Sequence, residues 1–224
     1  ISFGIAQCFG CQPTFYSLNL PFQLTPLLCL QLVIFALLIA TFSILFVLMM
    51  HYSHKWFHQY FHNPYIRVLV GAALLMILVV FFKQRYLGAG MDVVEAALYQ
   101  EVFPYDFFMK ALFTAITIGC GFKGGEIVPT FVIGSTLGYV LGLLLGMNPH
   151  LTAAIGIVGM FCCVINSPLT SLMLGAEMFG IQYLTAMAIV IAFCYVLSGY
   201  FSLYQAQKIV YSKTSVEFIN QNAK

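Results

Sequence analysis

The chain has 224 residues, of which 62% are hydrophobic and 7% are charged, and its mean hydropathy is +0.96. Soluble domains carry about a quarter of charged residues, so this composition excludes an ordinary soluble protein. The formal net charge of +2 is too small and too scattered to indicate a nucleic-acid partner. Residues 1–54 and 127–176 contain no Asp, Glu, Lys or Arg, and a spanning helix needs only about 20 apolar residues. We therefore expect a multi-pass protein of the cell membrane, in contact with lipid.

The first 20 residues give few signals. The chain begins with Ile1 rather than Met and shows no signal-peptide pattern, so we expect a fragment whose beginning is missing. Cys8 and Cys11 form a CxxC motif. Without a second cysteine pair or a βαβ context, this motif does not indicate a redox or metal site.

The first membrane span is predicted at residues 27–50, after Thr25 as a cap and Pro26 in the first helical position. The segment that follows is rich in Tyr, Phe and Trp and carries Lys55 and Arg67. Aromatic belts mark the membrane interface, and positive charge is enriched on the cytoplasmic side. We expect this end of the helix to be cytoplasmic.

A row of histidines occupies the same segment at spacings of three, four and four residues. Its members are His51, His54, His58 and His62. One helical face could hold all four, as in a membrane di-metal oxidase, so a metalloenzyme using this row is one alternative function. The chain has only one further histidine, and the carboxylates lie far away in sequence. We therefore favour a solvated or lipid-facing interfacial row.

The next predicted elements are a helix that Asn63-Pro64 opens and that stays apolar over residues 68–82, a loop with a short helix over 86–104, and a helix over 104–118. Asp106 and Lys110 stand four residues apart in the last of these. This spacing predicts a modest ion pair on one helix face near a membrane surface.

The central motif is GCGFKGGEIVPTFVIGSTLG, residues 119–138. A glycine-rich run precedes a long apolar helix, with Pro129 in its first turn, where a missing N–H costs nothing. The first N–H groups of a helix have no partner inside it, and with the macrodipole they favour an anion. In lipid such an end is tolerated where protein buries it or an aqueous cavity meets it, so the motif predicts an ion-binding interruption.

Glu126 stands directly before this helix. A carboxyl group at membrane depth is a candidate proton or ion site, because an unpaired charge there is costly. Alternatively, Glu126 complements the helix dipole and pairs with Lys123. We favour the functional reading, whereas Glu177 fits a structural and a proton-carrying role equally well.

Small residues and helix breakers shape the remainder of the chain. Glycines recur at every fourth position at Gly134, Gly138, Gly142 and Gly146. Such a stripe favours close packing of another helix over a ligand role. Later breaks at Asn148-Pro149, Ser167-Pro168 and Gly180 leave pieces of about 12 to 18 residues, which indicate half-spanning helices of the transporter type. A final short helix is expected over residues 200–212, with Tyr204 at its start as either an interfacial residue or a donor to a buried anion.

Three motifs together carry a family resemblance. GGEIVP fits a GxFxP anion-site motif, with Gly125 and Pro129 matching and Ile127 in place of Phe. INSPLTSLMLGAEMFG, residues 165–180, looks like an APLT…E helix, and SLYQ places Tyr204 where a final tyrosine is expected. In order and spacing the chain resembles the CLC family of chloride channels and proton-coupled anion exchangers.

The resemblance implies an all-α polytopic membrane fold with tilted and half-spanning helices, one half of an inverted repeat. Residues 1–224 would form the C-terminal half of the membrane domain, with the N-terminal half missing. The serine loop and the gating glutamate loop of the family are absent from the sequence. Half of the anion ligands would then be lacking, and the chain should not transport by itself. The implied anion ligands present here are Gly125, Glu126, Ile127, Val128, Pro129 and Tyr204.

The implied function is anion transport, of chloride or another halide, by proton-coupled exchange, with a passive chloride channel as the alternative. Glu126 replaces the usual apolar residue, which resembles the bacterial fluoride-exporting branch and makes it the candidate for proton coupling. The resemblance further implies no enzymatic activity, no metal or cofactor, and a homodimer formed through helices at residues 167–179 and 182–197.

Overall fold

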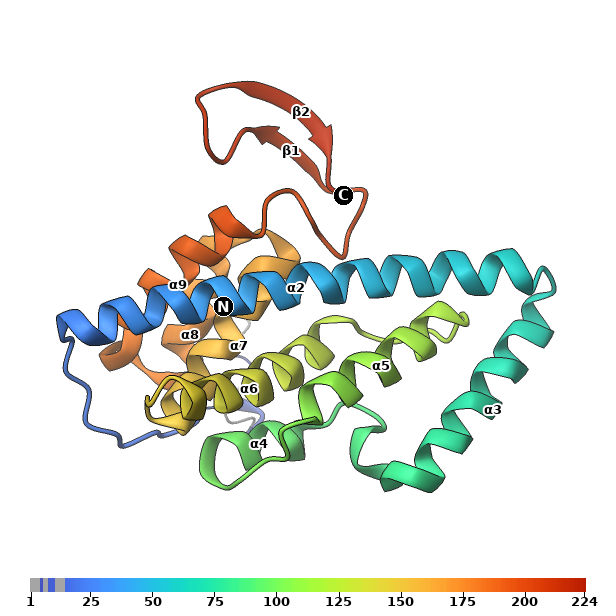
Figure 1. Ribbon diagram of the computed structural model, residues 1–224, viewed down its shortest axis with the longest axis horizontal. Coiled ribbons are helices and arrows are strands. Elements are labelled where there is room, and N and C mark those ends of the chain that lie inside the picture. The colour runs from blue at the N-terminus through green and yellow to red at the C-terminus, as the bar shows by residue number, and fades with distance from the viewer. Residues whose placement is uncertain (1–4, 6–7, 11–14) are drawn as a thin grey trace.

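The computed structural model of the protein describes residue 5, residues 8–10 and residues 15–224. The CxxC motif falls partly outside them, since Cys11 is not among the described residues. The described part is mainly helical (Figure 1). Its elements are α2 (Pro26–Tyr60), α3 (Pro64–Phe82), η1 (Lys83–Tyr86), α4 (Met91–Tyr99), α5 (Asp106–Gly119), α6 (Ile127–Leu144), α7 (Pro149–Ile165), α8 (Pro168–Phe179), η2 (Ile181–Tyr183), α9 (Leu184–Leu197), β1 (Lys208–Tyr211) and β2 (Phe218–Asn222).

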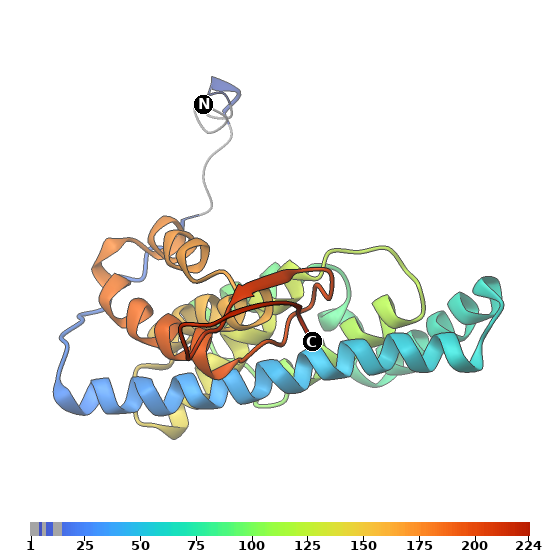
Figure 2. The same cartoon turned by 90° about the horizontal axis from the view of Figure 1, so that it is seen from above.

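Helix α2 runs along one side of the molecule (Figure 2). It begins where expected, because the Thr25 hydroxyl oxygen accepts the Leu28 N–H at 3.2 Å and Pro26 occupies the first position. Its 35 residues correspond to a length of about 52 Å. This exceeds the roughly 30 Å of a bilayer core. The helix therefore continues past the predicted span and carries His51, His54 and His58 of the histidine row beyond it.

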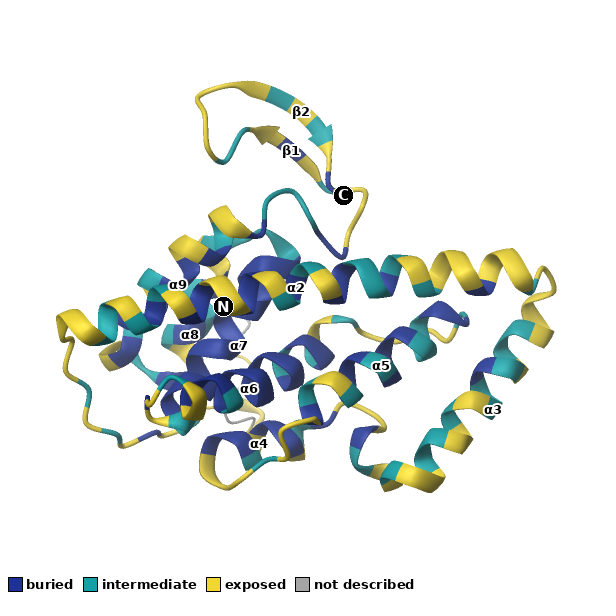
Figure 3. Cartoon of the chain, viewed as in Figure 1, coloured by how far each residue is buried: buried dark blue, intermediate teal, exposed yellow. Residues whose placement is uncertain are grey.

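Helix α3 turns back from the end of α2 after Asn63, whose side-chain oxygen accepts the Tyr65 N–H at 3.0 Å. Of the residues of this helix, all of them described, only Gly71 is buried. A Cβ added there would lie 2.2 Å from the Cys120 sulfur, so glycine allows α3 to approach the end of α5. The exposed surface of α3 and of the outer part of α2 is evident in Figure 3.

The core lies around α7, which α2, α6, α8 and α9 surround, and its residues are buried without a break from Leu151 to Val164. Helices α6 and α7 touch backbone to backbone. A Cβ on Gly134 would lie 2.6 Å from the Gly156 carbonyl oxygen, and one on Gly138 would lie 2.4 Å from the Thr152 carbonyl oxygen. The predicted glycine stripe is thus confirmed as a packing surface, although its last member, Gly146, lies beyond the helix.

Three helices among the described residues are long and apolar enough to cross a membrane: α2, α3 with η1, and α6. Helices α7 and α9 are apolar but shorter, and α8 has only 12 residues. The expectation of an all-α, multi-pass membrane protein with short helices in its second half is confirmed.

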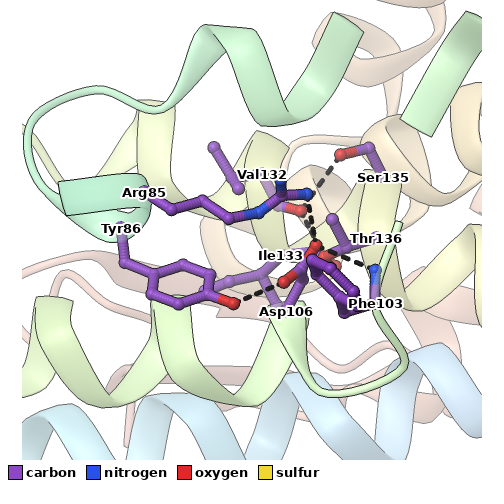
Figure 4. A network of polar contacts seen from close by, with 8 residues as sticks. All are labelled: Arg85, Tyr86, Phe103, Asp106, Val132, Ile133, Ser135 and Thr136. Carbon is purple, nitrogen blue, oxygen red and sulfur yellow. Dashed lines mark hydrogen bonds and ion pairs between the residues drawn. The ribbon is translucent and has the colours of Figure 1, made fainter. Parts of the chain in front are cut away.

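The expected ion pair between Asp106 and Lys110 is wrong. Both side chains are buried, and neither is the partner of the other. The partners of Asp106 lie just before α4 and, at Phe103, just after it (Figure 4). Asp106 receives hydrogen bonds from the Arg85 guanidinium at 2.8 Å, the Tyr86 hydroxyl at 2.5 Å and the Phe103 N–H at 3.1 Å. Lys110 donates instead to the carbonyl oxygens of Tyr86, at 3.2 Å, and of Gly88, at 2.7 Å.

The expected helix over residues 200–212 is also wrong. The chain is irregular up to Gln207 and then forms a small antiparallel hairpin, in which Lys208 of β1 lies opposite Asn222 of β2. The main-chain donors of this segment are engaged elsewhere, because Leu203 N–H donates to Val164 and Ser202 N–H donates to Lys224. β-Branched and aromatic residues in β1 further favour a strand.

Candidate functional site

The amino end of α6 has the form that the sequence predicts. Glu126 precedes the helix and makes no side-chain cap, so its carboxyl group does not occupy the free N–H groups of the first turn. Pro129 in that turn is buried. The loop before the helix is open, since a Cβ added at Gly124 or Gly125 would meet no atom within 4 Å. An anion could therefore approach this end without meeting a side chain of the loop.

A cavity of about 880 Å³ lies beside this end of the helix. Glu126 lines it from the α6 side, and Tyr204 lines it from the segment that follows α9. Two candidate residues far apart in sequence thus share one cavity. Tyr204 is 43% exposed, and its backbone N–H donates to the Ser202 hydroxyl at 3.2 Å. The permanent positive charges lining the cavity are Lys55, Arg67 and Lys123.

The other candidate residues are not brought to this cavity. Gly125, Val128 and Pro129 line a second cavity of about 540 Å³, together with Lys110. Ile127 is 36% exposed and lines neither cavity. The two cavities meet at the loop over residues 122–124, which lines both. The start of α6 therefore separates two spaces, with Glu126 on the side of the larger one.

The electrostatic setting of Glu126 differs from that of a surface carboxyl group. Burial raises its pKa above the usual value, because the charged form loses hydration. Lys123 lines the same cavity, yet within the described ranges the one ion pair is that of Arg85 with Asp106. The alternative in which Glu126 pairs with Lys123 is thus not observed, and Glu126 holds a proton more readily than an ordinary glutamate.

Three members of the histidine row, His51, His54 and His58, line the larger cavity. The fourth, His62, lies past the end of α2 and is exposed. The sequence indicates that these histidines share a helix face, but not that this face lines a cavity, so their place in the candidate site was not predicted. Their helical spacing, together with Arg67 shortly after the end of the helix, is the sequence signal that points to it.

Metal binding by the row finds no support. No group of three His, Cys, Asp or Glu side chains in the described part of the chain is arranged to hold a metal ion. Glu177, the other carboxyl group considered, is exposed on α8 and lines neither of the two cavities.

Comparison with known proteins identifies relatives of this chain. A chloride/fluoride channel protein of Pseudomonas syringae pv. tomato is 36% identical over 129 residues, which cover 58% of this chain and 28% of that protein. An uncharacterized protein of Methanocaldococcus jannaschii is 29% identical over 126 residues, 54% of this chain and 31% of that protein.

Among solved structures, the crystal structure of a CLC-type fluoride/proton antiporter superposes with a TM-score of 0.85 at 31% identity. The match covers 90% of this chain and 51% of that one, so the chain spans about half the length of the solved structure. The family model described as voltage gated chloride channel matches residues 1–199. Members of this family are channels and transporters rather than enzymes, and the chain belongs to it.

Proposed function

We propose that the protein to which this chain belongs carries halide ions across the membrane in exchange for protons, with fluoride as the favoured ion and chloride as the other candidate. The observation that carries the proposal is the shared cavity of Glu126 and Tyr204, lined by three permanent cations. The printed names of two relatives, a chloride/fluoride channel protein and a fluoride/proton antiporter, support the choice of ions.

The anion is held by dipoles and by hydrogen-bond donors. The free N–H group at Glu126, the one candidate at the start of α6 that lines the larger cavity, replaces part of its hydration, and the helix dipole adds a favourable field. The hydroxyl of Tyr204, which lines the same cavity, is the second donor. Binding remains modest, because an ion that is held too tightly would not leave.

Glu126 carries the proton. Its raised pKa allows protonation closer to neutral pH than an ordinary glutamate would show, and it sits at the helix end where the anion binds. Neutralising the carboxyl group removes its repulsion of the anion, so proton uptake and anion binding favour each other.

We further propose that residues 1–224 form the C-terminal half of a two-half membrane domain. The match to the solved antiporter covers 90% of this chain and 51% of that one, which supports one half of such a domain. The order of the three motifs in the sequence favours the C-terminal half. The remaining anion ligands would then come from the other half.

The protein is proposed to act as a homodimer through α8 and α9. These helices expose large apolar side chains, with Leu169 78% and Met173 73% exposed. Charged substitutions on this face, Leu169→Lys with Met173→Lys, should convert a dimer to a monomer in single-molecule photobleaching of the protein in liposomes. The same substitutions at Leu69 and Val80, which are exposed on α3, serve as the control. A stable dimer in the α8 variant would contradict this interface.

The transport proposal is tested with the full-length protein in liposomes, recording anion efflux and internal pH together for fluoride and for chloride. We expect anion flux with stoichiometric proton movement, and loss of the proton movement in Glu126→Gln. Glu101→Gln, an exposed carboxyl group outside both cavities, is the matched control. Unchanged proton-coupled flux in Glu126→Gln removes Glu126 from the mechanism, and flux without protons in the wild type indicates a channel.

A further inference from the structure

We infer that His54 and His58 on α2, together with Arg67 on α3, form a second anion-binding subsite in the larger cavity that binds an anion and a proton together. This inference rests on the proposed transport function, which it extends to the loading of the anion. The ligand is a small monovalent anion such as a halide.

The contact between Arg67 and His58 is the first step. The Arg67 Nη1 lies 2.8 Å from the His58 Nδ1. A guanidinium group has donors only, so Nδ1 must accept this hydrogen bond, and the neutral imidazole carries its proton on Nε2. Arg67 is itself fixed, because its Nε donates to the Cys120 carbonyl oxygen at 3.3 Å. The His58 tautomer is therefore set by an anchored cation.

Protonation of His58 changes this contact. A second proton on Nδ1 removes the acceptor and leaves two cations facing each other. A proton on His58 thus puts a positive charge beside Arg67. The ring of His54 lies 4.4 Å from that of His58, centroid to centroid, so a proton on His54 adds a positive charge next to His58. An anion placed among these groups would accept hydrogen bonds from their N–H groups and offset the repulsion between the positive charges. Proton uptake and anion binding are thus coupled at this cluster.

The surroundings favour an anion there. The cavity has a volume of about 880 Å³, and Glu126 is the one carboxyl group among its lining residues in the described part of the chain. His51 also lines the cavity, and its Nε2 is buried without a hydrogen-bond partner among the described residues, which adds a polar atom available to a ligand or its water. The other charged or titratable groups facing the cluster are Lys55 from α2, Cys120 at the end of α5, Lys123 and Glu126 before α6, and Tyr204 after α9.

A purely structural role for the cluster predicts a different outcome. Arg67 would then only tie α3 to the end of α5, and the pH should not change anion affinity through the histidines. The double variant His54→Gln with His58→Gln separates the two possibilities. Glutamine keeps a side-chain oxygen that can accept from Arg67 but cannot be protonated. Glu126 stays in place, so any pH dependence that it causes remains in the variant.

The experiment uses the full-length protein in liposomes of zwitterionic lipid. The apparent KM for fluoride and for chloride is measured with the solution on the side of the membrane that the larger cavity faces at about pH 5.5 and at about pH 7.5. These two values bracket the titration of an ordinary imidazole. We expect the wild-type KM to fall about threefold to tenfold toward the lower pH, since one added charge near the anion is worth roughly that factor. The double variant should lose the part of this change that the two histidines cause, at similar kcat. His62→Gln, outside the cavity, should behave like the wild type.

Equilibrium binding of fluoride to the purified protein at the same two pH values provides an independent measurement. If the wild type does not transport but its binding is pH-dependent and the dependence is smaller in the double variant, the subsite stands and the proposed transport fails. Equal pH dependence in wild type and double variant overturns the subsite. A pH effect on KM that requires anionic lipid also overturns it, because a lipid headgroup would then occupy the cluster.

Discussion

The guanidinium of Arg85 donates to the Asp106 carboxylate across 2.8 Å and so ties η1, the turn after α3, to the first residue of α5. The carboxylate is fully buried, whereas the Arg85 side chain is 32% exposed. Tyr86 and the Phe103 N–H complete the shell around the carboxylate. The corner between α3 and α5 thus depends on one buried charge.

Removing this carboxylate should destabilise the protein. Asp106→Ala leaves Arg85 without its partner, and breaking a buried pair costs about 3 kcal/mol. We expect a clear fall in the thermal unfolding midpoint of the detergent-solubilised protein. Asp106→Asn should cost less, because its amide oxygen still accepts from Tyr86. Asp92→Asn, at an exposed position on α4, is the control, and an equal loss in that variant would contradict the assignment.

The backbone contact between α6 and α7 should not tolerate a methyl group. In Gly138→Ala the new Cβ meets the Thr152 carbonyl oxygen at 2.4 Å, so the two helices must move apart. Overpacking of this kind costs about 2 kcal/mol. Gly124→Ala has open space around its new Cβ and should unfold like the wild type. Equal unfolding midpoints for the two variants would show that the helices adjust freely.

The Tyr204 hydroxyl should contribute to anion affinity. Tyr204→Phe removes one donor to the anion, and a hydrogen bond to a charged group is worth about 1.5 kcal/mol, or roughly a tenfold loss of affinity. Isothermal titration of the full-length protein with fluoride measures this directly. Tyr211→Phe, in the exposed hairpin, is the matched control. Unchanged affinity in Tyr204→Phe would exclude the hydroxyl from the site.

Proton-coupled flux should depend on pH through Glu126. Its pKa is raised in the folded protein, so the carboxyl group is protonated at low pH and loses its proton as the pH rises through the folded value. The protonated fraction of Glu126 therefore decreases toward alkaline pH, and we expect the coupled flux to fall in the same direction. Glu126→Gln mimics the protonated state at every pH, so its remaining anion flux should lose this component. A profile identical to the wild type would contradict the role.

Local signals in the sequence predicted the helix starts correctly. Thr25 with Pro26, Asn63 with Pro64, and Asn148 with Pro149 each begin a helix where expected, because a cap and a first-turn proline act within a few residues. The glycine stripe on α6 was equally readable, since helical periodicity alone places its members on one face.

Long-range partners could not be predicted in the same way. The spacing of Asp106 and Lys110 suggested a pair within one helix, yet Arg85 lies 21 residues earlier and competes more strongly once the carboxylate is buried. The helix expected at Tyr204 fails because Val164, far away in sequence, accepts the Leu203 N–H. The motifs likewise could not show that the six expected anion ligands do not share one cavity. Glu126 and Tyr204 line the larger cavity, three others line the smaller one, and Ile127 lines neither.

The glycine contacts between α6 and α7 also constrain how the protein can work. Two helices with backbones in such close contact cannot slide past each other unless they first move apart. We therefore expect α6 and α7 to move as a single rigid body. The positively polarised amino end of α6 then keeps a fixed position relative to α7 and does not itself act as a gate. We expect motion in the proposed transport cycle to involve the glycine-rich loop before α6 and the side chains of Glu126 and Tyr204.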